Sequence, residues 1–582
     1  MPSDDPRRAA SPARGQVLQA AAGAFLIVVG AVLLPRPLTT LQAVIWMLPL
    51  TLLVVVVLRL REGRSRGPLR VLAGILLAST VASVVFTEAA ARALPVVVAV
   101  GLAANALRLV VAAARSGRLD ERLARIAFGA ACAVAAVLSW MWPDVALLLV
   151  AWLAAITAML AGAVSIWRAV RRGPARAPKR HRVLRGLGAV MAMVVAATAW
   201  AASAWALEDV TAPDDFYRWT GAMPETAGQL LRVGPYAGET PAGSSALRIL
   251  YTTSRADGSA TVASAVVAVP TAAADGDRMV LAWQHGTTGV AQPCAPSLES
   301  NALSEYAVPG ISRAIDRGWV VVATDYPGQG TDGRYPYLIG RGEAQSTLDA
   351  VRAVRGMPDA KASSEVMLWG HSQGGHATLW AGAIANDYAP ELDVVGVAAL
   401  SAAADPLALA EKVTQSGASA LADAITSYVL VPYADEYADI DLGAATHPAG
   451  SVFAEAAASR CVVDRNMIVS LLVGWGLGDH DSLYRLNLVE GPVHDRLVEN
   501  AADGVVPAPL FLGQGVDDEV VPIAIQRALG DRLCATGRVV DAHEYPGATH
   551  MGVIAEGAPL IDDLFAWADA VLAGGQPAGC DV

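Results

Sequence analysis

Two contrasting patterns of apolar and polar residues divide this chain near residue 210. Before that point, apolar stretches follow one another, each close to the roughly 20 residues with which a helix crosses a bilayer. They cover residues 16–34, 38–58, 69–86, 94–114, 124–141, 145–167 and 184–207. Because these stretches continue from residue 16 to residue 207, they differ from the single short apolar core of a cleaved signal peptide. The pattern predicts an α-helical membrane domain with about seven spans.

The first six predicted spans look like three copies of one helical hairpin. In each copy, an apolar helix that contains Gly leads to a Pro, and a second helix returns to an Arg. The three sets are Gly23…Pro35…Arg59, Gly74…Pro95…Arg115 and Gly129…Pro143…Arg168. A period of about 53 residues indicates an internal repeat. The arrangement resembles the HdeD-like family of small membrane proteins, so residues 16–171 are interpreted as a six-span HdeD-like module, with a plain multi-helix anchor as the alternative.

After Pro213, short apolar strands alternate with helical segments and Gly/Pro turns. An antiparallel pair is expected at residues 247–253 and 262–269. Further strands are expected at residues 279–284, 319–324, 365–369, 394–400, 508–512 and 538–544. The intervening helices are expected at residues 304–316, 344–355 and 375–386, and a last helix at residues 560–572. This alternation predicts a doubly wound parallel sheet covered on both faces.

One long segment, residues 405–505, interrupts this alternation. It favours helices and is rich in Ala, Tyr and Leu. An interruption of this length in a compact sheet domain is usually functional, which predicts a helical cap over a site. A structural insertion far from the chemistry is the alternative.

The distribution of charge follows the same division. The net charge is −11, yet residues 1–210 hold 23 of the 43 Lys and Arg and fewer than ten of the 54 Asp and Glu. A basic membrane half and an acidic soluble half explain this partition. The basic residues form short clusters without interleaved aromatic residues that could stack on bases, so no nucleic-acid partner is expected.

The basic clusters also predict an orientation. They precede the first span and follow the second, fourth and sixth spans, at residues 7–14, 59–70, 115–125 and 168–185. Because basic loops remain in the cytoplasm, residues 1–15 are expected to form a cytoplasmic tail. A seventh transmembrane helix, residues 183–207, then carries the following half to the extracytoplasmic side of the cytoplasmic membrane.

A candidate nucleophile lies between a predicted strand and a predicted helix, in Gly370-His-Ser372-Gln-Gly374-Gly. A serine on such a sharp turn projects its hydroxyl above the edge of the sheet, and Gly370 and Gly374 let neighbouring backbones pass closely. A Gly-x-Ser-x-Gly sequence alone is common by chance. The strand before it and the helix after it make Ser372 a strong candidate.

A nucleophilic serine needs a base and an acid that orients the base, in the chain order Ser, acid, His. Of nine histidines, His550 follows the last predicted strand and precedes the final helix, where the base is expected. His543 falls within that strand and is expected to be packed. For the acid, Asp518 has the better spacing before Pro522. Asp517 stays a second choice and Asp405 a third.

An acyl-transfer site also needs two backbone N–H donors for the oxyanion. One is expected from Gln373, the residue after the nucleophile. The other is expected from the loop His285-Gly-Thr287-Thr-Gly289, with Thr287 as the donor. An ordinary glycine turn is the alternative for this loop.

Four segments together resemble the secretory lipase family of α/β hydrolases, which includes Candida antarctica lipase A. They are Trp283-Gln-His-Gly-Thr-Thr-Gly289, Asp325-Tyr-Pro-Gly-Gln-Gly-Thr-Asp-Gly333, Gly370-His-Ser-Gln-Gly-Gly375 and Gly515-Val-Asp-Asp-Glu-Val-Val-Pro522. The resemblance implies an α/β-hydrolase domain over residues 213–582, a cap within residues 405–505, and a triad of Ser372, Asp518 and His550. Members of the family usually carry a cleavable secretion signal, whereas this chain has a membrane domain.

These features predict a membrane-anchored lipase or esterase that acts on lipid or other carboxylic esters outside the cytoplasm. An acyltransferase with the same triad is one alternative. The other is a non-catalytic membrane sensor or assembly protein whose hydrolase domain only binds a ligand. No cofactor and no metal are expected, because no His, Cys and Asp cluster has the spacing of metal ligands.

The chain has five cysteines. Cys132 falls within a predicted span and is interpreted as an inert small residue. The other four lie in the half expected to be exported, where an even number suggests two disulfides. Four cysteines allow three pairings, and Cys294–Cys461 with Cys534–Cys580 is the favoured one.

Overall fold

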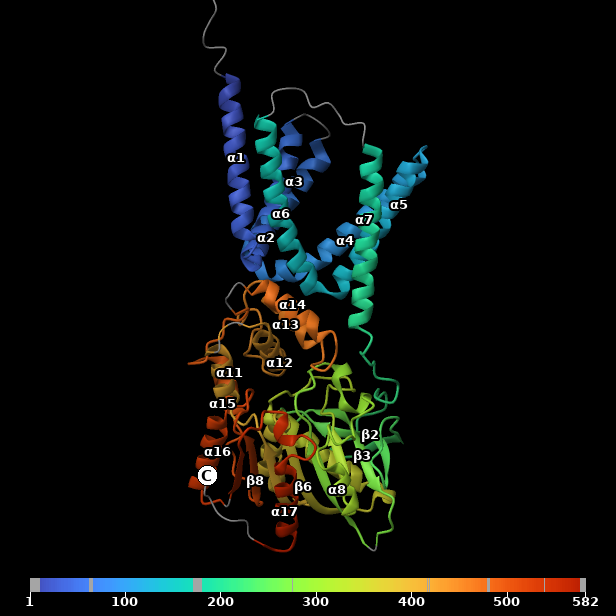
Figure 1. Cartoon of the computed structure of the whole chain (residues 1–582), viewed down its shortest axis with the longest axis vertical. Helices are drawn as coiled ribbons and strands as arrows, with labels where there is room; N and C mark the ends of the chain where they lie inside the picture. The colour runs from blue at the N-terminus through green and yellow to red at the C-terminus, as the bar shows by residue number, and fades with distance from the viewer. Residues whose placement is uncertain are drawn as a thin grey trace, which may run out of the picture.

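The computed structural model of the protein describes residues 11–61, 66–170, 181–274, 276–415, 417, 419–478, 482–538 and 540–575. A bundle of long helices and a sheet-based domain follow one another along the long axis of the molecule (Figure 1). The helices of residues 406–499 lie between the two halves (Figure 1).

Among the described residues, seven helices form the N-terminal half. They are α1 (Ser11–Leu33), α2 (Pro37–Arg61), α3 (Arg66–Val85), α4 (Thr87–Ala114), α5 (Leu119–Met141), α6 (Pro143–Val170) and α7 (His181–Ala206). Within the described residues, six of them are long and apolar enough to cross a membrane, whereas α3 has a shorter apolar part, Val71–Val85. Large apolar side chains cover the outside of this half, as expected where lipid replaces water.

A sheet of nine strands forms the centre of the C-terminal half, in the order β1-β2-β3-β5-β4-β6-β7-β8-β9. The strands are β1 (Leu230–Pro235), β2 (Ser244–Ser254), β3 (Ala260–Pro270), β4 (Arg278–Gln284), β5 (Val320–Thr324), β6 (Ala362–His371), β7 (Asp393–Leu400), β8 (Leu510–Gly515) and β9 (Val540–Tyr545). The predicted antiparallel pair, β2 with β3, is confirmed, and the strands from β5 to β9 are parallel. Strand β1 was not predicted from the sequence.

Two apolar cores cover the faces of the sheet. On one face, α9 (Gly340–Arg355), α10 (Gln373–Tyr388) and α16 (Ile523–Ala535) contribute to a core with Val280, Val322 and Leu368. On the other face, α8 (Ile311–Asp316) and α17 (Pro559–Leu572) pack with Leu281, Val321 and Met367. Because successive residues of a strand face opposite sides, both sides of these continuous apolar strands are buried, as the sequence pattern predicted.

The predicted helix of residues 304–316 is wrong at its start. The structure has turns before Ile311, and α8 begins only there. Gly310 precedes it with a φ of 78°, in the left-handed region that a right-handed helix excludes. The turn chemistry of Pro309-Gly310 therefore overrides the apolar periodicity around it.

The predicted interruption between β7 and β8, here called the helical insertion (residues 405–505), contains five helices in its described part. They are α11 (Pro406–Gln415), α12 (Ala420–Glu436), α13 (Gly450–Ala458), α14 (Met467–Leu477) and α15 (Pro492–Glu499). The insertion and the N-terminal helices share one apolar core, in which Leu41, Leu94 and Leu147 pack with Phe453 and Leu477. The two halves are therefore packed against each other as well as joined by the chain.

A buried ion pair lies within this junction. Two nitrogens of the Arg460 guanidinium donate to the two carboxylate oxygens of Asp144, each at 2.8 Å. The side chains are 4% and 0% exposed, respectively. Arg460 also donates to Ser470 Oγ at 3.0 Å and lies over the ring of Trp142, 5.0 Å from its centre. This bidentate geometry compensates for the removal of both charges from water.

We expect Asp144→Ala to loosen the junction, because it leaves the Arg460 charge buried without its partner. Loss of one member of a buried pair destabilises a protein by about 3–5 kcal/mol. Thermal unfolding of the purified protein in detergent should show a lower midpoint. Asp120→Ala, which removes an exposed partner of Arg118, is the control and should leave the midpoint nearly unchanged. An equal midpoint for both variants would contradict this role of Asp144.

Candidate active site

The sharp turn at Ser372 joins β6 to α10. Ser372 has φ 60° and ψ −121°, a strained conformation for a residue with a side chain. A Cβ on Gly370 would lie 2.2 Å from the carbonyl oxygen of Gly374, and a Cβ on Gly374 would lie 2.0 Å from that of Gln284. Only glycine fits at these two positions, as the sequence predicted for a serine held on a strained turn.

The structure brings Ser372, His550 and Asp518 together in one row of contacts. His550 Nδ1 lies 2.8 Å from Asp518 Oδ2, and His550 Nε2 lies 2.9 Å from Ser372 Oγ. Because a carboxylate only accepts hydrogen bonds, Nδ1 carries the proton and Nε2 is free to accept one from the serine. All three side chains are buried. This geometry fits a nucleophile, a base and an orienting acid.

Several donors surround the carboxylate of Asp518. Oδ1 accepts hydrogen bonds from the backbone N–H groups of Val520 (2.9 Å) and Val521 (2.8 Å), and Oδ2 accepts one from Gln514 Nε2 (3.0 Å). Burial alone would raise the pKa of Asp518. The hydrogen bonds from His550 and from these backbone groups outweigh it and lower the pKa of Asp518 below its ordinary value. Asp518 therefore stays ionised at neutral pH.

The other two candidate acids lie elsewhere. Asp517 is exposed, and its backbone N–H donates to the carbonyl of Ala548. Asp405 is at the start of α11, where its carboxylate accepts a hydrogen bond from the backbone N–H of Ala408 at 2.9 Å, as helix caps do. His543 is half-buried and hydrogen-bonds Asp541. Of the residues weighed as acid, only Asp518 contacts the base.

Two buried neutral histidines flank the reacting groups. Burial, with a smaller effect of the His550 ring, lowers the pKa of His371 to about 3. Its Nε2–H donates to the backbone carbonyl of His550 at 2.9 Å and so fixes the backbone that carries the base. Burial likewise lowers the pKa of His285 to about 4, so that this ring is neutral in the lining of the same cavity.

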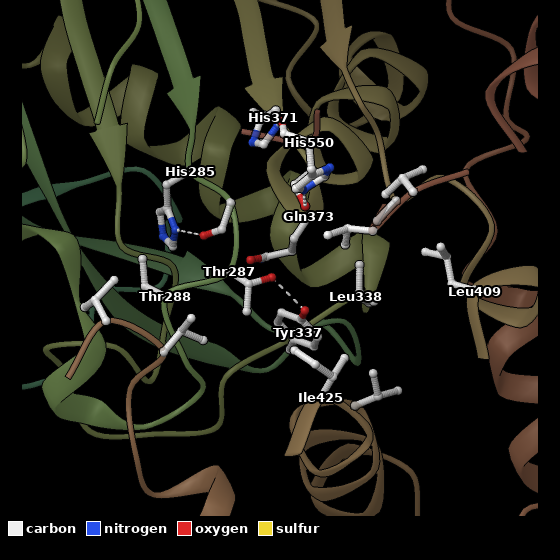
Figure 2. A pocket seen from close by; sticks show the side chains of 18 of the residues that line it. His285, Thr287, Thr288, Tyr337, Leu338, His371, Gln373, Leu409, Ile425 and His550 are labelled. Carbon is white, nitrogen blue, oxygen red and sulfur yellow. Dashed lines mark hydrogen bonds between the residues drawn. The ribbon is translucent and has the colours of Figure 1, made fainter. Parts of the chain in front are cut away.

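The loop after β4 approaches the nucleophile from the other side. A Cβ on Gly286 would lie 3.5 Å from Ser372 Cβ. Figure 2 shows Thr287 beside Gln373, with its hydroxyl directed to Tyr337; the two hydroxyl oxygens are 2.7 Å apart. Gln373 opens α10, so its N–H has no carbonyl one turn earlier within the helix. The backbone N–H groups of Thr287 and Gln373 stay the predicted oxyanion donors.

A buried polar network behind Gln373 was not predicted. The Gln373 side-chain amide donates to Tyr335 Oη (3.0 Å) and to Glu343 Oε1 (2.7 Å). Glu343 Oε2 lies 2.8 Å from His376 Nδ1, and both of these side chains are 0% exposed. These contacts fix the first turn of α10. Glu343 and His376 come from different helices, and no local motif links them.

A second layer of contacts supports the loop at His285–Gly289. The predicted disulfide Cys294–Cys461 is confirmed, with the two Cα atoms 5.3 Å apart. Thr288 Oγ1 donates to the carbonyl of Cys294, and the backbone N–H of Val462 donates to the carbonyl of Thr288, both at 2.8 Å. The second favoured pairing, Cys534–Cys580, involves Cys580, which lies outside the described residues.

The segment Asp325–Gly333 also supports the loop at His285–Gly289. Gln329 Nε2 donates to Thr288 Oγ1 (2.9 Å) and to the carbonyl of Gly289 (2.7 Å). Burial raises the pKa of Asp325 to about 6, partly offset by hydrogen bonds from Ser264 and Ser297. This segment is therefore a support for the candidate oxyanion loop rather than a source of reacting groups.

A cavity of about 1000 Å³ opens above Ser372 and His550. Most of its roof comes from the helical insertion, and its lining is largely apolar; Leu338, Leu409 and Ile425 are among the side chains drawn in Figure 2. Cavities of this kind suit a ligand with a long apolar part and a few polar groups.

The fold, and the order of serine, acid and histidine along the chain, are those of the α/β hydrolases. Comparison with known proteins identifies the group of α/β hydrolases that this chain resembles. Residues 296–579 match the secretory lipase family, and residues 127–201 match a short repeat of unknown function, DUF308. Both resemblances predicted from the sequence, a secretory lipase half and a repeat-containing helical half, are thereby confirmed.

Named relatives and solved structures agree with this match. Lipase 2 of Candida albicans is 31% identical over 288 residues, which cover 45% of this chain and 57% of that protein. Lipase A of Moesziomyces aphidis is 25% identical over 248 residues, 41% and 52% of the two chains. The chain thus spans about half the length of these relatives. The closed state of Candida antarctica lipase A superposes with a TM-score of 0.51 at 21% identity over 63% of this chain and 90% of that one, which shows a shared fold.

We expect the Cys294–Cys461 disulfide to stabilise the candidate oxyanion loop. The double variant Cys294→Ser/Cys461→Ser should lose about 2–5 kcal/mol of unfolding free energy, because the open chain gains entropy. Denaturant unfolding of the purified protein measures this loss. Cys132→Ser, at the free cysteine of the described residues, is the control and should unfold at the wild-type midpoint.

Proposed function

We propose that this protein is a membrane-anchored serine hydrolase of carboxylic esters, a lipase or esterase. The observation that carries the proposal is the row of contacts from Asp518 through His550 to Ser372 beneath an apolar cavity. The match to secretory lipases supports the same chemistry. In this proposal, residues 16–171 and 183–207 form the membrane domain, and residues 213–582 form the hydrolase domain.

The reaction would proceed in two acyl-transfer steps. His550 Nε2 takes the proton of Ser372 Oγ as the oxygen attacks the ester carbonyl, and the protonated imidazole then gives this proton to the leaving alcohol. Water attacks the acyl-enzyme in the second step, with His550 as base again. Asp518 keeps Nδ1 protonated and stabilises the imidazolium.

The oxyanion that develops at the carbonyl needs donors that are already in place. The backbone N–H groups of Gln373 and Thr287 would supply them. Two features favour this role: the buried network that fixes Gln373 at the start of α10, and the contacts that hold Thr287 and Thr288 in place. Burial raises the pKa of Tyr337 to about 12, so its hydroxyl stays protonated beside Thr287.

The helical insertion would act as a cap that shapes the acyl site. Leu409, Ile425 and Val429 are among its residues that line the cavity above Ser372. Apolar walls of this size favour an ester with a long acyl chain over a small polar ester. An acyltransferase with the same triad would differ in how well this cavity excludes water.

The hydrolase domain would lie outside the cytoplasm. The ends of α2 and α6 that carry the basic clusters point away from the hydrolase domain, whereas the turns at residues 34–37 and at Trp142 face it (Figure 1). Because basic loops stay in the cytoplasm, the opposite end of the bundle faces outward. A cytoplasmic N-terminus and an outward hydrolase domain need an odd number of spans, so the shorter apolar helix α3 would cross together with the six longer ones. The last span would then be α7, whose end at Ala206 leads directly to the hydrolase domain.

We expect a membrane-impermeant fluorophosphonate probe to label the protein on intact cells, because the probe reacts with activated serines. Ser372→Ala should abolish the labelling while the protein is still present in the membrane. Labelling only after lysis would contradict the outward orientation. A folded wild-type protein that stays unlabelled after lysis would contradict the enzymatic proposal and favour a non-catalytic role, which one relative suggests by its name, "Probable inactive lipase MT1628" of Mycobacterium tuberculosis.

We further expect the two adjacent aspartates to differ sharply. Asp518→Asn should lower kcat for a nitrophenyl ester by about 10⁴-fold, because an amide does not hold His550 in the required tautomer. Asp517→Asn changes the neighbouring exposed carboxylate in the same way and should keep nearly wild-type activity. Equal losses in the two variants would show that Asp518 is not the orienting acid.

A further inference from the structure

Helix α14 has an apolar face that no part of the described chain covers. Ile468, Leu472 and Trp475 are 45%, 60% and 74% exposed. Their spacing places them on one side of a helix. The opposite side is buried in the junction between the halves, where Val473 and Leu477 join the shared apolar core. Three large apolar side chains on one exposed face indicate a surface that contacts something other than water.

The position of α14 relative to the candidate membrane spans indicates what covers this face. A Cβ on Gly476 would lie 2.6 Å from Leu148 Cδ2, in α6. Leu148 is five residues after Pro143, where α6 begins, and thus about 7.5 Å along the helix axis. The C-terminal end of α14 therefore lies beside the first turns of a candidate membrane span. An interfacial helix buries its apolar face to a similar depth, about 5–10 Å, at the boundary of headgroups and acyl chains.

The other end of α14 is tied to the last span. Arg465, two residues before α14, pairs with Glu208 and with Asp209 (2.9 Å) just after α7, and lies over Trp205, 5.5 Å from the ring centre. Trp140 and Trp205, which are 69% and 48% exposed, lie near the C-terminal ends of α5 and α7. Tryptophans gather at the level of lipid headgroups. Trp475 in α14 extends this belt.

An opening of the cavity, here called its mouth, lies beside the C-terminal end of α7. Glu208 and Asp209, which follow α7, line the cavity above Ser372. So do Val463, which precedes α14, and Leu421, at the start of α12. Val463 and Leu421 are also 65% and 57% exposed, so the cavity has an opening between the end of a span and the apolar helix. Tyr306, Val520 and Met551 are exposed lining residues elsewhere on the cavity.

We propose that the face of Ile468, Leu472 and Trp475 is a membrane-docking surface that holds the mouth of the cavity at the outer leaflet, so that the substrate is an ester lipid resident in that leaflet. This substrate class rests on the proposed function; the docking surface itself does not. The lipid leaves the bilayer beside α7 and enters an apolar cavity without crossing water. The cavity lining also includes Glu299 and Asp464, near Asp209. Arg465 offsets part of the charge of Glu208 and Asp209, and the remaining carboxylates disfavour anionic lipids and favour neutral esters such as diacylglycerol.

The docking surface can be tested by a spin-label measurement that does not depend on catalysis. A nitroxide attached to Leu472→Cys, in the Cys132→Ser background, is placed on the full chain in phosphatidylcholine nanodiscs. We expect this nitroxide to collide more with oxygen, which dissolves in lipid, than with a water-soluble nickel chelate. A nitroxide on Val489→Cys, at an exposed residue of the same insertion (83% exposed), is the control and should prefer the nickel chelate. A nickel preference at residue 472 would overturn the proposal.

Delivery of the lipid substrate from the leaflet is tested by comparing hydrolysis of a membrane-bound ester with hydrolysis of a dissolved one. Ile468→Ser/Leu472→Ser/Trp475→Ser should lower hydrolysis of a fluorescent diacylglycerol in the nanodisc by about tenfold or more, since apolar burial holds the surface in place. Hydrolysis of dissolved nitrophenyl butyrate should stay at the wild-type rate. The matched control, Val489→Ser/Val498→Ser, should change neither rate. Equal losses on both substrates would overturn leaflet delivery. A wild-type protein that hydrolyses neither ester, with residue 472 in lipid, would refute the proposed function and leave the docking surface standing.

Discussion

The buried pair of Arg460 and Asp144 is the contact on which the relation between the two halves depends. It joins a turn of the helical insertion to the first turn of α6, with both side chains almost fully buried. A buried charge without a partner is strongly unfavourable, whereas the paired arrangement satisfies both carboxylate oxygens. The pair therefore specifies one orientation of the hydrolase domain against the helices. Apolar packing alone would permit several similar orientations, because it has little directional preference.

The same short segment leads from this junction to the reacting groups. Cys461 follows Arg460 and is bonded to Cys294, and the N–H of Val462 donates to the carbonyl of Thr288. Thr288 is next to Thr287, the candidate oxyanion donor. The hydroxyl of Tyr428, a residue of α12, donates to the carbonyl of Arg460 at 2.9 Å. The helix ends, the roof of the cavity and the oxyanion loop thus share three consecutive residues, so the setting of the membrane helices and the shape of the site are physically continuous.

The sequence predicted best where local chemistry decides the structure. The strained turn at Ser372 needs Gly370 and Gly374 in fixed positions, and the long apolar stretches need a bilayer, so both are visible in short segments. The row of Ser372, Asp518 and His550 could be predicted because their order follows the order of the strands. Contacts between distant segments could not be predicted in this way. Asp144 and Arg460 are 316 residues apart, and no motif in the sequence around Asp144 indicates a partner. The network of Glu343 and His376 likewise depends on how two helices pack.

A tethered hydrolase with an interfacial helix differs physically from a secreted one. A free enzyme must partition to a lipid surface at each encounter, and a single shallow apolar face gives reversible binding. Here α7 and the Asp144–Arg460 junction keep α14 beside the bilayer, so its docking is intramolecular and proceeds at a high effective concentration. Ile468, Leu472 and Trp475 are then enough to hold the mouth of the cavity at the bilayer, because the spans have already removed most of the translational freedom of the hydrolase domain. On this argument, the helical half does more than retain the enzyme: it sets the height of the cavity mouth relative to the lipid, and the ion pair fixes that height.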